Sequence, residues 1–466
     1  MSGTVTGAHV LVYPFPYFSH IIPILDLTHR LLTRGLIITF VITPNDLSLL
    51  QPLLSIYPPS SLQSLVLSIP ETIISKSHVL IAKIRATREH HYPALVHWFK
   101  SHPSPPVAII SDFLTGWTND LAREVSVKRL VFSPTGAMYL SYSFSLWLDL
   151  PRNDNPDNVY TPIVFPNVPN SPIYPWWQLS FVYIGGKEGD PDWEMYRSMN
   201  MANRVSWGAV FNSVAELEGV YFDHLKQEMG HDRVWAVGPL RPIDDDVVGA
   251  MHRGRPSSLP PDEVTTWLDA RELRSVVYVG FGSHMMLTRS QMDVLAAALE
   301  HSGVPFILSI RGPNGKEDGE IPDGFEDRVA DRGLVIKGWA PQATILRHRA
   351  TGAFLTHCGW NSLMEGLTAG LVMLTWPLAA DQFTNAKLLV DQLGVGIRVS
   401  EGTEVIPEPT ELAQLLIESL DENRPERVRA KELGKAALEA VKGGSSDKDL
   451  DELVKRLSEL DNQPRS

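Results

Sequence analysis

The segment from Trp339 to Gln382 holds the densest group of residues that could do chemistry. Within it, the apolar run Gly352–Thr356 predicts a buried strand, and the residues His357–Ser362 that follow predict the start of a helix. A helix N-terminus presents unpaired N–H groups and the positive end of the helix dipole, which favour a phosphate group. Gly359 lets the backbone approach closely, and His357, Asn361 and Ser362 add side-chain donors. The segment therefore predicts a phosphate site, although His357 taken alone would be interpreted as a structural histidine.

Two further residues of this segment indicate a nucleoside beside the phosphate. Trp339 lies before Pro341 in a predicted loop, where a large aromatic side chain needs a partner to stack on. A uracil ring would fit that face, with the backbone of Ala340 reading the edge of the base. The alternative is a tryptophan that fills a gap between domains. Glu365 lies one helical turn beyond Asn361, where its carboxylate could accept hydrogen bonds from ribose hydroxyls or lie on a solvated helix face.

A second glycine-rich turn, Gly280–Ser283, follows another predicted strand. It lacks the third glycine of the dinucleotide-binding fingerprint, so its signal alone is weak. A contact from Ser283 and the backbone of Gly282 to a phosphate remains compatible with the pattern. An NAD-dependent oxidoreductase would need the complete fingerprint and an acidic ribose anchor about 20 residues further on. The turn therefore argues against that alternative.

The N-terminal half supplies a candidate general base, His20. It follows the apolar run His9–Pro14, and α/β folds place ligands at the C-terminal ends of parallel strands. The unperturbed pKa of imidazole is about 6.5, so a neutral base is available at neutral pH. Asp112 follows the run Val107–Ser111 and should emerge at the same edge, where its carboxylate would fix the tautomer of the imidazole. The alternatives are a histidine that contacts backbone at a helix start and an aspartate that caps the next helix.

Alternating apolar runs and helical patterns are expected to position these residues. Unalternated apolar strands with helices between them indicate parallel sheets covered on both faces. The predicted strands are His9–Pro14, Ile37–Thr43, Leu65–Ile69, Val107–Ser111, Arg129–Ser133, Gly208–Asn212, Ser275–Phe281, Pro305–Ile310, Leu334–Ile336, Gly352–Thr356 and Val372–Trp376. The predicted helices include Ile22–Leu32, His78–Lys100, Thr115–Glu124, Ser290–His301 and Trp360–Ala369.

The length of 466 residues predicts two domains. The predicted fold class is α/β, with two doubly wound Rossmann-like domains that face a central cleft. Residues 150–195, dense in Pro, Asn, Asp and aromatic side chains, are predicted to form a long loop over a site. The polar residues 241–262 are predicted to form the linker between domains 1–240 and 263–445. A helix at 446–466 is expected to pack back on the N-terminal domain.

Composition excludes several classes of partner. The net charge of -13 argues against nucleic acid and anionic membrane surfaces, and no apolar run reaches the length of a membrane span. Cys358 is the single cysteine, so an intrachain disulfide and a cysteine-based zinc site are excluded. The adjacent His90 and His91 would diverge on a helix, so we expect a solvated face rather than a metal pair. With no secretory signal visible, the expected location is cytoplasmic.

The segment Trp339–Gln382 resembles the signature box of the plant UDP-sugar-dependent glycosyltransferases, glycosyltransferase family 1. Within that family the sequence most resembles the group that includes flavonol 7-O-glycosyltransferases. The resemblance implies the GT-B fold, an acceptor-binding N-terminal domain and a UDP-sugar-binding C-terminal domain. It implies a UDP site made by Ser283, Trp339, Ala340, Gln342, His357, Asn361, Ser362 and Glu365, a sugar site made by Trp360, Asp381 and Gln382, and a catalytic pair made by His20 and Asp112. Ser19 and Ile22 replace the glycine and asparagine that the family usually has beside the base.

The expected reaction is a single displacement with inversion, without a metal ion or other cofactor, in which UDP-glucose is a co-substrate. Gln382 favours glucose, because glutamine at this position goes with glucose in the family. Apolar and aromatic residues near the expected cleft favour a flat phenolic acceptor such as a flavonoid; they are Phe113, Trp117, Met138, Tyr139, Trp147, Trp176 and Trp177. The alternatives are transfer from UDP-rhamnose or another UDP-sugar, and a non-catalytic nucleotide-sugar binder. The protein is expected to be a monomer.

Overall fold

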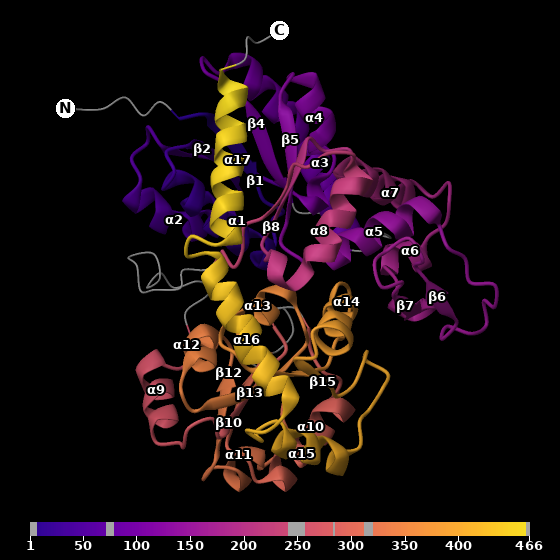
Figure 1. Cartoon of the computed structure of the whole chain (residues 1–466), viewed down its shortest axis with the longest axis vertical. Helices are drawn as coiled ribbons and strands as arrows, with labels where there is room; N and C mark the ends of the chain where they lie inside the picture. The colour runs from indigo at the N-terminus through magenta and orange to yellow at the C-terminus, as the bar shows by residue number, and fades with distance from the viewer. Residues whose placement is uncertain (1–6, 71–78, 241–256, 283–284, 312–319, 463–466) are drawn as a thin grey trace. The chain divides into compact units, whose positions relative to one another are not determined.

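The computed structural model describes residues 7–70, 79–240, 257–282, 285–311 and 320–462 (Figure 1). The chain divides into two compact units. Unit 1 comprises Met1–Arg253 with Ala440–Ser466, and unit 2 comprises Gly254–Glu439. Most of the predicted linker, residues 241–256, lies outside the described residues, and helix α9 (Pro261–Asp269) begins before its predicted end.

Unit 1 is built on a seven-stranded sheet in which neighbouring strands are parallel. Across the sheet the strands are β3 (Leu62–Val66), β2 (Ile37–Ile42), β1 (His9–Tyr13), β4 (Ala108–Asp112), β5 (Lys128–Ser133), β8 (Gly208–Phe211) and β9 (Val234–Ala236). The strand order reverses between β1 and β4. Such a reversal leaves a crevice at the C-terminal strand ends, where α/β folds bind ligands. Because β1 leads to His20 and β4 ends at Asp112, the topology brings both residues to this point.

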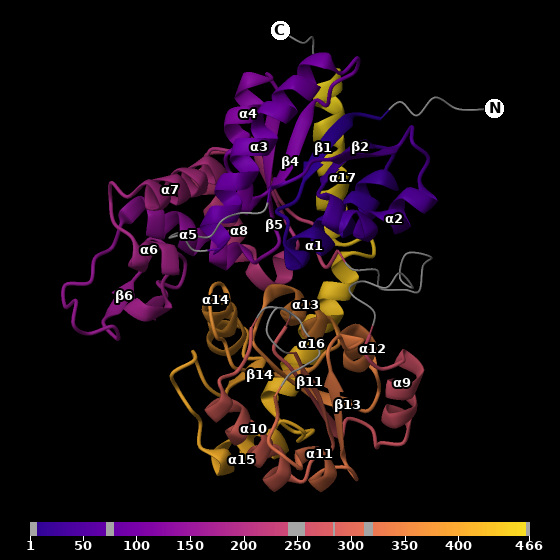
Figure 2. The same ribbon diagram turned by 180° about the vertical axis from the view of Figure 1, so that it is seen from behind.

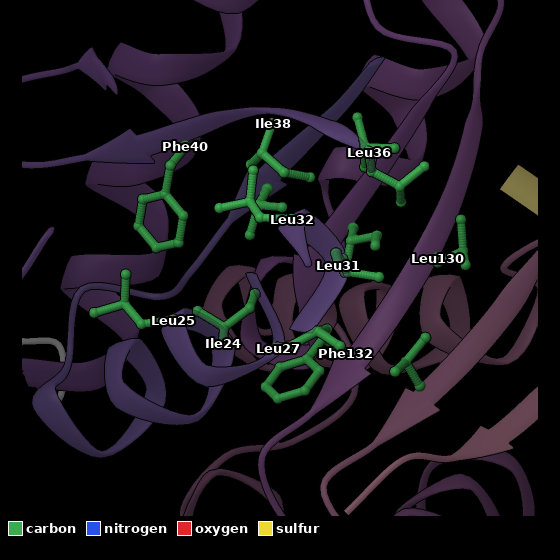
Figure 3. Close-up of a cluster of buried hydrophobic side chains, with 14 of the residues drawn as sticks. Ile24, Leu25, Leu27, Leu31, Leu32, Leu36, Ile38, Phe40, Leu130 and Phe132 are labelled. Carbon is green, nitrogen blue, oxygen red and sulfur yellow. The ribbon is translucent and has the colours of Figure 1, made fainter. Parts of the chain in front are cut away.

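Helices cover both faces of this sheet, because alternate residues of β1 belong to different core clusters. Val10 and Val12 pack with α1 (Phe18–Leu32) and the C-terminal helix, whereas Leu11 and Tyr13 pack with α3 (Val79–Ser101) and α4 (Thr118–Glu124). The close-up in Figure 3 shows the first cluster. The helices of unit 1 are α1 (Phe18–Leu32), α2 (Leu47–Ile56), α3 (Val79–Ser101), α4 (Thr118–Glu124), α5 (Ala137–Asp149), α6 (Phe181–Gly185), α7 (Pro191–Arg204), α8 (Ala215–Met229) and α17 (Ser445–Asp461).

The last helix, α17, belongs to unit 1 although it follows unit 2 in the sequence (Figure 2). Leu450, Leu453 and Leu457 recur at helical spacing and are buried in the same cluster as Val10. The carboxylate of Asp449 also accepts a hydrogen bond of 2.7 Å from the backbone N–H of Ala236 in β9. Helix α17 is therefore held on unit 1 by one apolar face and one polar contact.

Unit 2 repeats the parallel design with six strands. Across this sheet the strands are β12 (Gly333–Lys337), β11 (Phe306–Ile310), β10 (Val276–Gly280), β13 (Thr351–Thr356), β14 (Val372–Thr375) and β15 (Gly396–Arg398). The order reverses between β10 and β13, which lead to Gly282 and His357. The helices are α9, α10 (Arg289–Ser302), α11 (Phe325–Arg328), α12 (Gln342–Arg347), α13 (Trp360–Thr368), α14 (Gln382–Lys387), α15 (Pro409–Glu418) and α16 (Pro425–Ala440), the last of which ends where unit 1 resumes.

Residues 150–195 are not the long loop that their composition predicted. They contain an antiparallel pair, β6 (Pro162–Val164) and β7 (Ile173–Pro175), followed by α6 and the start of α7. The ring of Tyr142 in α5 packs on Phe165 and Tyr174, with centroids 4.9 and 5.0 Å away. These contacts between residues distant in sequence supply a small local core, which composition alone could not indicate.

Three other predictions for unit 1 need correction. Helix α1 begins at Phe18 rather than Ile22, so His20 lies in its first turn rather than before the helix. Strand β3 is Leu62–Val66 rather than Leu65–Ile69. His91 is buried, with 3% of the residue exposed, and hydrogen-bonds Tyr13 rather than facing solvent. Helix α3 buries one side against the sheet, and its adjacent histidines therefore face different surroundings.

Candidate active site

The first part of the site is a hydrogen-bonded pair in unit 1. The Nδ1–H of His20 donates to Oδ2 of Asp112 at the end of β4, with 2.8 Å between the two atoms. The Asp112 side chain is fully buried, whereas 14% of the His20 side chain is exposed. Because Nδ1 is engaged, Nε2 is the ring nitrogen that can take a proton from a substrate hydroxyl. The structure thus brings together the two residues predicted to form the catalytic pair.

The carboxylate of Asp112 is oriented from both sides. Its Oδ1 accepts a hydrogen bond of 2.9 Å from the backbone N–H of Leu114 and so caps the short helix Phe113–Thr115. Its other oxygen accepts from His20. The two alternatives for Asp112, partner of a histidine or helix cap, are therefore both realised, one on each oxygen.

Aromatic rings surround the imidazole of His20. Phe113 stacks on it at a centroid distance of 5.8 Å and an interplanar angle of 21°. Phe15 and Tyr17 meet it edge-on at 5.8 and 6.2 Å, and Tyr139 in turn contacts Phe113. Apolar aromatic walls of this kind suit a flat ligand next to the base.

Two of the aromatic residues expected to line the acceptor pocket belong to the core instead. Trp117 is buried and packs edge-on against Tyr13. Trp147 is buried against Tyr183 and Trp193. Large aromatic side chains bury more area than any others, so composition alone cannot separate pocket from core.

The turn from β13 to α13 in unit 2 is the predicted phosphate site. Gly359 is the N-cap of α13, so the helix begins with the N–H groups of Trp360, Asn361 and Ser362. The ring of His357 lies against this turn, because a Cβ built on Gly359 would overlap its Nε2. A Cβ on Gly282, which follows β10 with a φ of 74°, would overlap the same atom. The two glycines therefore allow His357 to sit between the turns after β10 and β13.

Three residues predicted to hold ribose and diphosphate form one cluster. The Nε2 of Gln342 donates to Oε2 of Glu365 at 2.8 Å and to Oγ of Ser362 at 3.0 Å. The hydroxyl of Tyr278 in β10 donates to Oε1 of Gln342 at 3.3 Å and orients the amide. Burial raises the pKa of Tyr278, which keeps this hydroxyl protonated. Tyr278 was not predicted, because a tyrosine in an apolar strand carries no sign of its partner.

Trp339, predicted to stack uracil, is held by a cation. The guanidinium carbon of Arg311 lies 4.0 Å from the centre of its ring, and the Nε of Arg311 donates to the carbonyl of Gly338 at 3.2 Å. The carbonyl of Ala340 accepts from the N–H of Gln342 at 2.8 Å. The backbone thus joins the loop after β12 to Gln342, whereas the stacking of uracil on Trp339 stays a prediction.

The two residues predicted to read sugar hydroxyls lie at the start of α14. The Oε1 of Gln382 accepts from the backbone N–H groups of Leu378 and Ala379, at 2.8 and 3.1 Å. The amide oxygen of Gln382 is therefore engaged within its own turn, so the predicted pair of one donor and one acceptor for sugar hydroxyls is reduced to the amide N–H groups. Asp381 is partly buried and precedes the helix.

Asn385, which sequence analysis did not consider, contacts the predicted sugar site. Its Nδ2 donates to Oδ2 of Asp381 and to the carbonyl of Cys358, both at 2.9 Å. Cys358 has a φ of 64°, a conformation rare for a residue with a side chain, in the turn before α13. Asn385 thus couples the predicted sugar site to the phosphate turn. Its spacing of one helical turn from Asp381 was the available signal.

The remaining predicted residues are placed as follows. Ser283 lies outside the described residues. The side chain of Trp360 is buried, and its backbone N–H is the first of those at the start of α13. Within the described ranges, no group of three or more His, Cys, Asp or Glu side chains is arranged to hold a metal ion. In the same part of the chain, no helix is long and apolar enough to cross a membrane.

A solved structure defines the class. UGT89C1 from Arabidopsis thaliana, complexed with UDP-L-rhamnose, is similar to this chain with 36% identity and a TM-score of 0.80. The similarity covers 97% of this chain and 100% of that one. Together with the two parallel-sheet units, it confirms the predicted GT-B fold of a UDP-glycosyltransferase.

Comparison with known sequences gives the family. The family described as UDP-glucoronosyl and UDP-glucosyl transferase matches residues 234–405. A flavonol 3-O-glucosyltransferase from Arabidopsis thaliana is 47% identical, covering 98% of this chain and 97% of its own length. A flavonol 7-O-rhamnosyltransferase from the same plant is 37% identical, covering 97% and 99%. The chain therefore belongs to the plant UDP-sugar-dependent glycosyltransferases of family 1, as its signature segment predicted.

Proposed function

We propose that this glycosyltransferase transfers glucose from UDP-glucose to a hydroxyl of a flavonol or a similar phenolic, with inversion. The hydrogen bond between His20 and Asp112 carries the proposal, because it supplies a base of fixed tautomer at the ligand-binding edge of unit 1. Residues 1–240 bind the acceptor, and residues 263–445 bind the UDP-sugar.

In the proposed reaction, Nε2 of His20 removes the proton of the acceptor hydroxyl. The oxygen attacks the anomeric carbon as the bond from that carbon to the UDP oxygen breaks, and UDP leaves with the electron pair. Attack opposite the leaving group converts an α-linked donor into a β-glucoside. Asp112 stabilises the imidazolium, and the N–H groups at the start of α13 stabilise the charge that develops on UDP. The proposed chemistry uses no metal ion.

The choice of glucose rests on two observations. The amide oxygen of Gln382 is engaged by backbone N–H groups of its own turn, so the N–H donors of the same amide are the groups proposed to meet sugar hydroxyls. The glucosyltransferase relative is also more similar to this chain than the rhamnosyltransferase, at 47% against 37% identity. UDP-rhamnose is the second candidate donor, because one relative is named for rhamnosyl transfer and UGT89C1 was solved with UDP-L-rhamnose.

The acceptor proposal rests on the aromatic surroundings of His20 and on relatives whose names specify flavonols. Phe113 and Tyr17 offer stacking and edge contacts to a planar ring. A cytoplasmic monomer is proposed from the single cysteine and the acidic composition.

The test is a matrix of donors and acceptors with the purified protein. UDP-glucose and UDP-rhamnose are each offered with a panel of flavonols and simple phenols, and product mass, linkage and anomeric configuration are determined. We expect a β-glucoside of a flavonol as the main product. A rhamnoside as the main product would replace the donor proposal, and binding of UDP-glucose without any product would support the non-catalytic alternative.

His20→Ala tests the base. We expect transfer to fall by at least about 10³-fold, in the range of losses on removing a catalytic base, while UDP binding to unit 2 is retained. Normal turnover in His20→Ala would remove His20 from its proposed role without affecting the donor assignment.

A further inference from the structure

Arg129 is a buried cation next to the proposed catalytic pair. It lies in β5 with 2% of the residue exposed, and uncharged oxygens accept its hydrogen bonds. Its Nη1 donates to Oδ1 of Asn203 at 2.8 Å and to Oγ of Ser206 at 2.6 Å. Burial lowers the pKa of Arg129 to about 9, which still leaves the guanidinium charged at neutral pH. Burying a cation is costly, so its position calls for a reason.

The contacts of Arg129 converge on the end of β4. Its Nε donates to Oγ of Ser111 at 2.9 Å, and its Nη2 approaches the carbonyl of Asp112 at 3.4 Å. Asn203 extends the same network, because its Nδ2 donates to the carbonyl of Phe113 at 2.8 Å. One guanidinium therefore holds, directly or through one amide, three successive residues at the strand end.

Two of these three residues contact the His20 imidazole directly. Asp112 accepts the hydrogen bond from Nδ1, and Phe113 stacks on the ring. The Asp112 carboxylate is fully buried, and Asp112 interacts electrostatically with Arg129. The contacts of Arg129 at the strand end therefore fix the direction in which the Asp112 carboxylate meets Nδ1, which leaves Nε2 as the ring nitrogen that can act as the base.

We propose that Arg129 is a positioning residue for the transfer reaction, which holds the Asp112 carboxylate in its orientation behind His20. The inference rests on the proposed roles of His20 and Asp112 and goes beyond them, because Arg129 acts on the base only through Asp112 and Phe113. The ordinary alternative is a purely structural arginine that ties α7 to the sheet through Asn203 and Ser206.

Arg129→Met and Arg129→Lys separate the two explanations. We expect Arg129→Met to lower kcat about 10- to 100-fold, as loss of an outer partner of a functional group does. The KM for the UDP-sugar should change by less than about twofold, because unit 2 is untouched. Arg129→Lys keeps the charge but loses the planar fork, so it should recover part of the loss. Ser206→Ala is the matched control: it removes one hydrogen bond to the same guanidinium on the α7 side and should leave kcat unchanged.

A kinetic double-mutant cycle with Asp112→Ala gives the decisive readout. If Arg129 acts through Asp112, then adding Arg129→Met to Asp112→Ala should lower the residual kcat by less than about twofold. The same fold loss in both backgrounds would show a general structural role and overturn the inference, as would a wild-type kcat for Arg129→Met. If Arg129→Met does not fold by circular dichroism, Arg129→Lys in both backgrounds provides the same comparison.

His20→Ala distinguishes failure of this inference from failure of the proposed function. An inactive His20→Ala beside an unaffected Arg129→Met overturns the role of Arg129 alone. A fully active His20→Ala overturns the catalytic pair, and the role of Arg129 with it.

Discussion

His91 should make unit 1 sensitive to acid, and replacing it should remove that sensitivity. The hydroxyl of Tyr13 donates to its Nδ1 at 2.6 Å, and its Nε2 donates to the carbonyl of Ser68 at 3.2 Å. This arrangement needs a neutral ring. Burial lowers the pKa of His91 from 6.5 to about 4, although the hydrogen bond to Ser68 acts in the opposite direction.

The magnitude follows from the difference between folded and unfolded protein. A histidine whose pKa is depressed on folding contributes stability above its unfolded pKa, here near 6.5, and loses it as the pH falls toward the folded value of about 4. Each unit of pH in that window costs up to about 1.4 kcal/mol. Between pH 7 and pH 5, the loss from this one group is therefore about 2 kcal/mol.

The assay is urea unfolding at pH 7 and pH 5 for wild type, His91→Gln and His97→Gln. His91→Gln should be less stable than wild type at pH 7, because the buried hydrogen bonds are disturbed, but it should lose about 2 kcal/mol less on going to pH 5. His97 is exposed on the same helix, and its replacement should leave the pH dependence unchanged. If His91→Gln and wild type lose equal stability between the two pH values, then the buried, neutral state of His91 is wrong.

Three further predictions concern catalysis and donor binding. Asp112→Asn should lower kcat by about 10³- to 10⁴-fold, because an amide no longer holds the reactive tautomer of His20. Steady-state kinetics should show this loss with an unchanged KM for the donor. A loss of kcat below about tenfold would contradict the prediction. Gly359→Ala should raise the KM for the UDP-sugar about tenfold, because the added methyl group displaces His357. Gly219→Ala is the control, because Gly219 lies at a helix position with open space around it, and its KM should not change. An unchanged KM in Gly359→Ala would show that the close packing is dispensable. Glu365→Gln should weaken UDP binding by about 1–2 kcal/mol in calorimetry, because a carboxylate acceptor for the ribose is lost. Equal UDP affinities of the variant and the wild type would remove Glu365 from the ribose site.

Much of the candidate UDP-sugar site could be predicted from the sequence, because its residues are close together along the chain. His357, Asn361 and Ser362 follow one buried strand, and a strand followed by a helix start has the same local geometry in any parallel sheet. His20 and Asp112 could also be paired in advance, since the ends of two apolar strands meet at one sheet edge.

Contacts between distant residues could not be predicted in this way. The tie from Arg129 to Ser111 and Asn203 depends on the neighbouring positions of β4, β5 and α7, and no local pattern encodes that arrangement. The same is true of Tyr278 on Gln342. The sequence of 150–195 is rich in turn-forming residues, yet its aromatic side chains pack into a core that only the folded chain assembles.

The sequence by itself thus determined the class of ligand, the alternation of strands and helices, and the residue types that could act on a nucleotide-sugar. The tertiary structure decided which side chains are committed to one another: it buried His91, engaged the oxygen of Gln382 in its own turn, and set Arg129 behind Asp112. The physical reason is that local geometry depends on neighbours in sequence, whereas burial and hydrogen-bond partners depend on neighbours in space.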